Sequence, residues 1–184
     1  MLINTRTHIG IVGSRHLTGA QKNRPRSLAK TAVNCGLQVI TGCARGADHA
    51  ARQGAASHPS RLTVFKATTR QPYHLVQRTI QLVNHLAAQP KPLLVAYTTT
   101  AAPSGLNHHT NGWQSVGSGT WSAVALATAK GIPVFIYGHG HHLPVSFGHW
   151  HQYRSPCAAL HRHWFVLRPA PANANQQSLF SAKQ

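Results

Sequence analysis

Glycine-rich turns that carry arginine or hydroxyl side chains are the parts of this sequence best suited to chemistry. One of them precedes an alanine-rich segment of high helix propensity, so its backbone N–H groups would lie at the positive end of a helix, where a phosphate binds well. Arginines in the other two turns could add forked hydrogen bonds to phosphate. The three turns are Gly13-Ser14-Arg15, the segment 42–48 with Arg45, and Gly117-Ser118-Gly119-Thr120.

Each of these turns also has a purely structural interpretation. The turn from Gly117 to Thr120 could serve only to cap a helix, and Arg15 and Arg45 could be ordinary surface arginines. A single glycine pair is weak evidence for a binding site. Three such turns at one place in a fold are stronger evidence than any one of them.

Asp48 is the only acidic residue among the 184 of the chain. It stands at the predicted start of a helix, where a carboxylate contributes about 1 kcal/mol to stability. It could instead orient Arg15 or Arg45, or accept a hydrogen bond from a ribose hydroxyl. The deficit of carboxylates excludes most enzymatic mechanisms that depend on them, so no catalytic residue is predicted.

The chain carries 18 Lys and Arg residues and a formal net charge of +17. Such a balance favours the binding of polyanions. However, the number of basic residues is ordinary for this length, and the net charge results from the lack of Asp and Glu. The charge therefore fits either a nucleic-acid partner or a general compositional bias.

Apolar runs that end at glycine alternate with helical segments along the chain. Strands are predicted within 8–15, 37–42, 62–66, 93–97, 134–137 and 161–168, and helices at 27–36, 48–56, 73–88 and 122–130, with Pro25 as an N1 residue. The pattern predicts an α/β fold, a doubly wound parallel sheet of Rossmann-like type in three α/β/α layers. In such a sheet the ligand binds at the carboxyl ends of the strands, where the three turns would meet.

The length and the hydrophobic content of 42% fit a single domain over residues 1–168, with a long loop at 98–115 and a flexible tail at 169–184. No apolar run approaches the roughly 18 residues of a membrane span, and no signal peptide is expected. Cys35, Cys43 and Cys157 lack CxxC spacing, which indicates reduced thiols. These features predict a cytoplasmic protein.

Three motifs resemble, in order and spacing, those of the Rossmann-like SLOG superfamily. The similarity extends over 9–137 and is closest to the DNA-processing protein A (DprA) family, which has an arginine-bearing helix where Arg78 stands. The segment 70–115 departs from the family's pattern, and no winged-helix domain is recognised. The motifs are IVGSR at 11–15, TGCARGADHAA at 41–51 and GSGTWSAVALATAKGIPVF at 117–135.

The resemblance implies a phosphate-binding surface for single-stranded nucleic acid or a nucleotide, in a protein that can form a homodimer and that hands DNA to the RecA recombinase. Neither a cofactor nor a metal is predicted. Trp121 is added as a side chain that could stack on a base, the alternative for it being a core position. The predicted site residues are Gly13, Ser14, Arg15, Arg45, Gly46, Asp48, Arg78, Gly117, Ser118, Gly119, Thr120 and Trp121.

Two other functions are left open. The related Lonely Guy hydrolases use the glutamate of a PGGxGTxxE motif to cleave nucleoside monophosphates, and here that position holds Ala123, which cannot handle a proton. A module that senses a nucleotide and reports to a partner is the third possibility. The 15 histidines include a run at 139–142 that could bind a metal adventitiously or reflect general enrichment in histidine.

Overall fold

The fold is built on one mixed sheet. The computed structural model describes residues 6–106, 118–138, 143–144, 147–152 and 164–167, and within these residues the strand order is β3-β2-β1-β4-β5-β7-β6. The first five strands in this order are parallel, and β7 and β6 are antiparallel additions at one edge. The strands are β1 (His8–Gly13), β2 (Gln38–Gly42), β3 (Leu62–Phe65), β4 (Pro92–Tyr97), β5 (Val134–Tyr137), β6 (Trp150–Gln152) and β7 (Trp164–Leu167).

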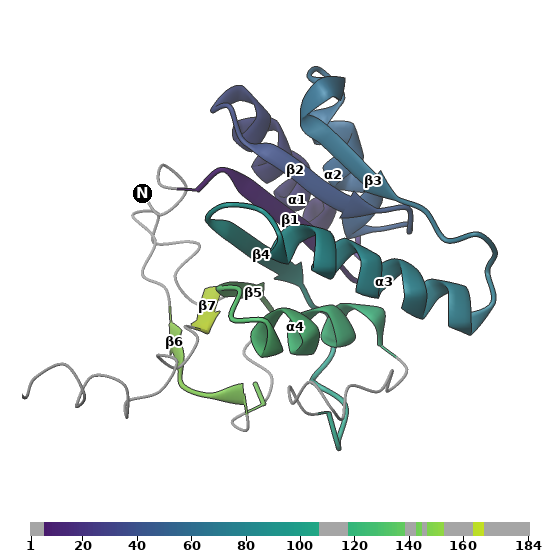
Figure 1. Ribbon diagram of the computed structural model, residues 1–184, viewed down its shortest axis with the longest axis vertical. Coiled ribbons are helices and arrows are strands. Elements are labelled where there is room, and N and C mark those ends of the chain that lie inside the picture. The colour runs from purple at the N-terminus through teal and green to yellow at the C-terminus, as the bar shows by residue number, and fades with distance from the viewer. Residues whose placement is uncertain (1–5, 107–117, 139–142, 145–146, 153–163, 168–184) are drawn as a thin grey trace, which may run out of the picture.

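Helices cover both faces of the sheet, as Figure 1 shows. Alternate residues of each buried strand point to opposite faces. Ile9 and Ile11 of β1 pack with α1 and α2, whereas Val12 belongs to the core beneath α3 and α4. The three-layer Rossmann-like prediction is thus confirmed. The helices are α1 (Gly19–Asn34), α2 (Ala47–Ala55), α3 (Pro72–Ala87) and α4 (Gly119–Ala129), and a short 3-10 turn, η2, spans Pro59–Arg61.

The order of the strands reverses between β1 and β4. The chain runs outward from β1 through β2 to β3, and α3 then carries it back across the sheet to β4 on the other side of β1. At this switch point the connections diverge to opposite faces, which leaves a crevice at the carboxyl ends of the two strands. The fold therefore marks the ends of β1 and β4 as the place for a ligand.

Helix α1 begins earlier than the sequence prediction. Pro25 is not its first residue but lies inside it, because Thr18 forms a capping box with Gln21 and starts the helix at Gly19. The Thr18 backbone N–H donates to the Gln21 side-chain oxygen at 2.9 Å. Reciprocal bonds of this kind fix a helix start more firmly than the preference of proline for the first turn.

The antiparallel edge was only partly predicted. A strand within 161–168 was expected and β7 is found there, but no strand was predicted around Trp150, where β6 is found. Trp150 pairs with Leu167, so this strand depends on a partner distant in sequence. The predicted tail at 169–184 and half of the predicted loop, 107–115, lie outside the described residues. No helix in the described part of the chain is long and apolar enough to cross a membrane.

Candidate nucleotide-phosphate site

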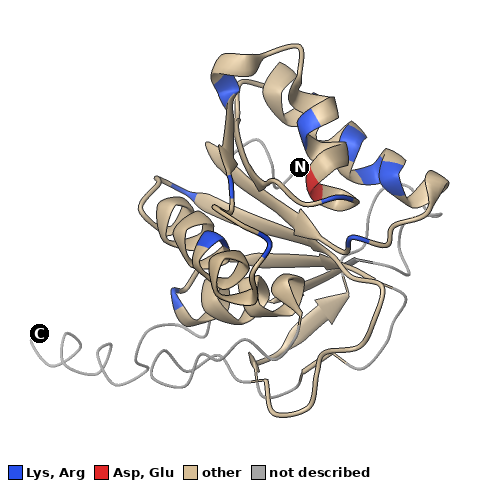
Figure 2. Ribbon diagram, turned by 90° about the vertical axis from the view of Figure 1, so that its right-hand side faces the viewer, with Lys and Arg blue, Asp and Glu red and all other residues tan. Residues whose placement is uncertain are grey.

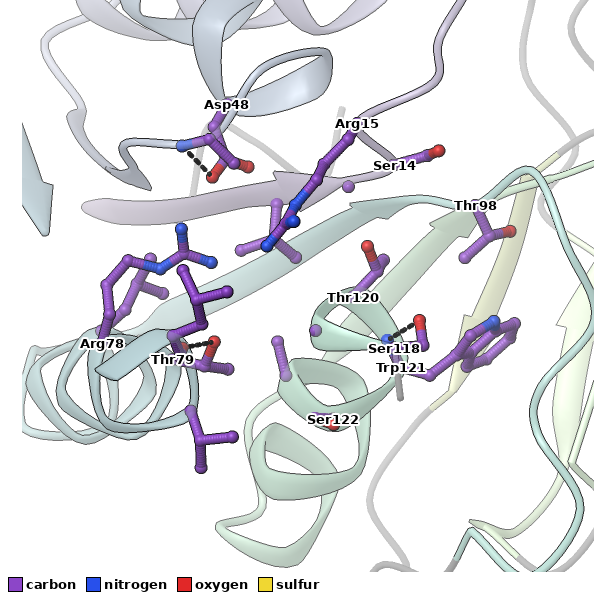
Figure 3. Close-up of a pocket in the computed structure, with 18 of the residues that line it drawn as sticks. Ser14, Arg15, Asp48, Arg78, Thr79, Thr98, Ser118, Thr120, Trp121 and Ser122 are labelled. Atoms are coloured by element: carbon purple, nitrogen blue, oxygen red, sulfur yellow. Dashed lines mark hydrogen bonds between the residues drawn. The ribbon is translucent and has the colours of Figure 1, made fainter. Parts of the chain in front are cut away.

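A cavity of about 540 Å³ opens at the carboxyl ends of β1 and β4. It is bounded by the turn after β1, the start of α2, one side of α3, the threonines after β4 and the first turn of α4 (Figure 3). This is the switch point of the sheet, so the fold places the predicted turns around a common space. Nine of the twelve predicted site residues line it, namely Gly13, Ser14, Arg15, Asp48, Arg78, Ser118, Gly119, Thr120 and Trp121.

The turn after β1 and the turn after β2 pack closely against each other at glycine residues. A Cβ atom on Gly13 would lie 2.6 Å from the Ala47 Cβ and 2.7 Å from the Tyr97 carbonyl oxygen. Gly46 has a φ of 70°, and a Cβ there would collide with the Ser14 carbonyl oxygen. That oxygen accepts a hydrogen bond of 3.1 Å from the Ala47 N–H. Gly46 therefore packs between the two turns and does not line the cavity.

The two arginines of these turns differ in position. Arg15 is exposed and its side chain extends into the cavity, whereas Arg45 is exposed but does not line it. The neighbouring Ser14 hydroxyl accepts hydrogen bonds from the Thr99 hydroxyl at 2.8 Å and from the His16 N–H at 3.1 Å. Ser14 therefore connects the β1 turn to the segment after β4, and Arg15 is the exposed cation that lines the cavity.

Helix α4 directs its first turn at the cavity. Ser118 is the N-cap, and its hydroxyl accepts from the Trp121 N–H at 3.4 Å. The first N–H groups of a helix have no acceptor within the helix, so Gly119 and Thr120 offer backbone donors at its positive end. Gly119 is exposed and Thr120 partly exposed. The predicted Gly117 lies outside the described residues.

Trp121 is a core residue. Only 2% of its surface is exposed, and its indole N–H donates to the Thr100 carbonyl oxygen at 3.2 Å. Figure 3 shows the ring directed away from Arg15 and Arg78. The structure therefore leaves no free ring face on which a base could stack, because the indole is part of the packing between α4 and the sheet.

Arg78 is the most unusual cation of the site. It reaches the cavity from α3, yet only 8% of its surface is exposed. Its Nη1 donates to the Cys43 sulfur at 3.7 Å, and its buried Nε has no hydrogen-bond partner. A buried charge without a matched counter-charge is costly. The site therefore holds a guanidinium whose hydrogen-bonding capacity is incompletely used.

Asp48 lies in the first turn of α2 and is 3% exposed. Its Oδ2 accepts a hydrogen bond of 3.2 Å from the Ala44 N–H. Burial raises the pKa of this carboxyl above its usual range, although the charges of Arg78, Arg52 and Arg15 and the Ala44 amide act in the opposite direction. From the sequence, Arg15 and Arg45 were both possible partners of Asp48. Of these two, Arg15 is the one whose charge lowers the pKa of the Asp48 carboxyl.

Gly42 allows Asp48 and Arg78 to approach the same point from opposite sides. A Cβ on Gly42 would collide with the Asp48 Oδ2 and lie 3.4 Å from the Arg78 Cζ. On the α2 side, Arg52 donates to the Gly42 and Ala44 carbonyl oxygens. The end of β2 is thereby fixed between two arginines and one carboxylate.

Several lining residues were missed in the sequence. Thr98, Thr99 and Thr100 follow β4, and their place at the switch point could have been predicted from the strand order. Leu75 lies in the helix predicted at 73–88, and its apolar side chain forms part of the cavity wall. Apolar periodicity shows that a helix packs against something, and it does not show where the packing ends and a cavity begins.

A family model described as DNA recombination-mediator protein A matches residues 1–109. The chain belongs to this family. The match spans β1 to β4 and so includes the first two turns and Arg78, whereas the α4 turn lies beyond it. The chain is therefore a DprA-type protein concerned with DNA processing. Comparison with curated proteins and with solved structures gives no match.

Metal ligands do not gather in the described residues, where no group of three or more His, Cys, Asp or Glu residues could hold an ion. The histidine run at 139–142 lies outside them. Arg15, Arg78 and the α4 amides are all donors, so the chemistry that the described cavity supports is the binding of an anion.

Proposed function

We propose that this DprA-type protein binds single-stranded DNA by taking one phosphate-bearing nucleotide unit into the cavity at the ends of β1 and β4. The α4 amides of Gly119 and Thr120 would hold a phosphate, and Arg15 would close over it from the opening. Thr98, Thr99 and Thr100, which follow β4, line the same cavity.

The observation that carries the proposal is the buried Arg78 guanidinium. It lines the same cavity as the first turn of α4, and its Nε has no acceptor. Figure 3 shows Arg15 and Arg78 extending toward a common space from opposite sides. Asp48 lines the same cavity and interacts with both cations, so it offsets part of their mutual repulsion. A phosphate is a further anion that guanidinium groups bind in forked geometry.

The size and lining of the cavity support a single nucleotide unit. A volume of about 540 Å³ lies within the range of pockets that hold small molecules. Pro72, Leu75 and Val76 of α3 form an apolar wall on which the sugar or base can pack. The rest of a strand would then lie outside the cavity on a molecule of strongly positive net charge.

That charge is spread over the molecule. Figure 2 shows Lys and Arg positions on several helices and loops together with a single acidic position. The formal net charge is +17. Such a surface attracts any polyanion, so affinity alone does not test the cavity, whereas the salt dependence and the residues on which binding depends do.

The test is fluorescence anisotropy with a labelled single-stranded oligonucleotide at two salt concentrations, with nucleoside monophosphates as competitors. Arg15→Ala is expected to weaken binding about tenfold, because each well-placed ionic hydrogen bond contributes about 1.5 kcal/mol or more. Arg78→Gln is expected to weaken it further. Unchanged affinity in both variants would show that DNA does not use the cavity.

Arg45→Ala is the matched control. Arg45 is an exposed arginine of a neighbouring turn that does not line the cavity. If the strand continues from the cavity across the start of α2, Arg45→Ala weakens oligonucleotide binding and leaves competition by mononucleotides unchanged. Equal losses for Arg15→Ala and Arg45→Ala with both ligands would indicate nonspecific attraction and contradict the proposal.

A nucleotide-sensing role is the second candidate, and the cavity volume of about 540 Å³, which suits a single nucleotide, favours it. It predicts that a mononucleotide binds saturably and does not compete with DNA. The hydrolase alternative receives no support from Ala123, which lines the cavity where the Lonely Guy motif has its glutamate. Release of free base from a nucleoside monophosphate, followed by chromatography, would restore that alternative.

A further inference from the structure

Cys43 lies at a junction of three elements, outside the wall of the cavity. It follows Gly42, the last residue of β2, and precedes the start of α2, and it is partly exposed. Cys35, at the end of α1, is exposed and serves as an internal reference. Both are free thiols, so the chain offers two cysteines whose surroundings can be compared directly.

The neighbour that distinguishes Cys43 is Arg78. This α3 residue is more than nine-tenths buried, and its Nη1 donates to the Cys43 sulfur at 3.7 Å. Its Nε is buried and has no hydrogen-bond partner. In a chain with one carboxylate, a thiolate is the second side-chain anion that could balance this cation. The contact thus points to a charged sulfur.

The other charges around Cys43 come from α2. Asp48 opposes a negative sulfur, whereas Arg52 binds the carbonyl oxygens of Gly42 and Ala44, on either side of Cys43. Burial by itself would raise the pKa of the Cys43 thiol. The Ala67 backbone amide and the Arg78 guanidinium outweigh that effect, and the pKa of Cys43 is lowered.

We propose that Cys43 is a reactive thiolate and a site of covalent modification by small electrophiles, in particular hydroperoxides. Nothing in this proposal requires that the cavity binds DNA. The thiolate is the nucleophilic form of cysteine, and a cation beside a partly exposed sulfur is the setting in which reactive cysteines occur. Cys35 is more exposed, so greater access alone would favour Cys35.

The reaction with hydrogen peroxide balances without a further reagent. The Cys43 sulfur attacks one peroxide oxygen, an S–O bond forms, and the O–O bond breaks. Hydroxide leaves and takes a proton from solvent to become water. The sulfur is oxidised to a sulfenic acid and the peroxide is reduced, which is the first step of the cysteine oxidation ladder.

The test compares the two thiols in one molecule. In a Cys157→Ser background, the full chain is treated with iodoacetamide over a series of pH values, and the rate at each cysteine is followed by peptide mass spectrometry. The rate at Cys43 is expected to reach its plateau at lower pH than the rate at Cys35, and to be several times higher in mildly acidic buffer. A Cys43 profile that coincides with that of Cys35, or lies at higher pH, would overturn the proposal.

Substitutions of Arg78 test the cause. Arg78→Gln is expected to move the Cys43 profile to higher pH and Arg78→Lys to retain most of the parent behaviour, while Cys35 is unchanged in both. If circular dichroism shows that Arg78→Gln is unfolded, the proposal is still tested by the pH profiles of Cys43 and Cys35 in the parent and in Arg78→Lys. A Cys43 profile that does not move in folded Arg78→Gln would contradict the role of this guanidinium.

Hydrogen peroxide followed by dimedone, which traps sulfenic acids, tests the oxidation itself. Labelling is expected at Cys43 several times above that at Cys35, and it should disappear in Cys43→Ser. Equal labelling of the two cysteines would show that Cys43 has no special reactivity toward peroxide.

Discussion

The helices on the two faces of the sheet pack differently near the switch point at the ends of β1 and β4. On one face, α1 and α2 approach so closely that a Cβ on Gly54 would collide with the Arg26 carbonyl oxygen and lie 3.0 Å from the Ala29 Cβ. On the other face, α3 and α4 share a core and border the cavity at the strand ends. Close contacts at small residues hold the helices of one face together, whereas the helices of the other face border an open cavity.

The difference shows how one sheet provides both a rigid support and a binding site. The α1–α2 layer holds the ends of β1 and β2 through backbone contacts that only glycine allows, such as the contact of Gly46 with Ser14. The positions of Arg15 and Asp48 follow from these contacts. The α3–α4 layer then supplies the groups that face the space, above all Arg78.

Gly46→Ala is expected to have the largest effect on this arrangement. The φ of 70° disfavours alanine, and the added methyl group would collide with the Ser14 carbonyl oxygen. Strain and displacement together should lower the free energy of unfolding by about 3 kcal/mol. Urea denaturation measures this loss. Gly131→Ala is the control, since its φ is 69° with no atom within 4 Å of the new Cβ, and it should lose only about 1 kcal/mol.

Gly54→Ala tests whether the α1–α2 face is closed by packing. Alanine favours a helix over glycine by about 1 kcal/mol, so an open site would be stabilised. Here overpacking against the Arg26 carbonyl oxygen should exceed that gain, and a net loss of about 1–2 kcal/mol is expected. Gly19→Ala, with open space around its Cβ at the start of α1, should cause no loss. Stabilisation by Gly54→Ala would show that the two helices can separate.

Addition of a ligand tests the open face. A single-stranded oligonucleotide at about ten times its Kd should raise the free energy of unfolding by about 1.4 kcal/mol. The same increase is expected in Gly54→Ala, whose substitution lies on the opposite face, and a smaller one in Arg78→Gln. Thermal unfolding with and without the oligonucleotide gives these increments. An increment that Gly54→Ala abolishes and Arg78→Gln preserves would reverse the assignment of the two faces.

The smallest expected effect is the pH dependence contributed by Asp48. The folded protein binds this proton more tightly than the unfolded chain does, because burial raises the pKa of Asp48. In the unfolded chain the carboxyl titrates at about pH 4. The Asp48 contribution to stability should therefore fall as pH rises through this range. The unfolding free energy of the parent minus that of Asp48→Asn separates the Asp48 contribution from that of the histidines. This value should fall as pH rises through the range, and a value that rises would contradict the prediction.

Local signals in the sequence predicted the parallel core of the fold and the three glycine-rich turns, each of which contributes residues to the cavity wall. Strand β4 was predicted because its apolar run is continuous, and α3 because its stripe has helical spacing. Strand β6 could not be, since Trp150 becomes part of a strand only by pairing with Leu167. The start of α1 was misplaced because Pro25 was given more weight than the hydrogen-bonding pair Thr18 and Gln21.

The site shows the same limit. Arg15 and Arg45 look alike in the sequence, each in a small-residue turn after a strand, and only the packing of Gly46 against Ser14 directs one of them to the cavity and the other away. The burial of Arg78 and its contact with Cys43 join positions 35 residues apart. No local pattern contains such a contact.

The burial of Asp48 has a consequence for how copies of this protein meet. The single acidic side chain is 3% exposed, so no carboxylate side chain lies on the outer surface. Two copies therefore cannot attract each other through salt bridges between acidic and basic side chains. Charge repulsion opposes their approach at low ionic strength, whereas a polyanion bound between two copies favours it. Association of this protein with itself should therefore depend on the nucleic acid that is present.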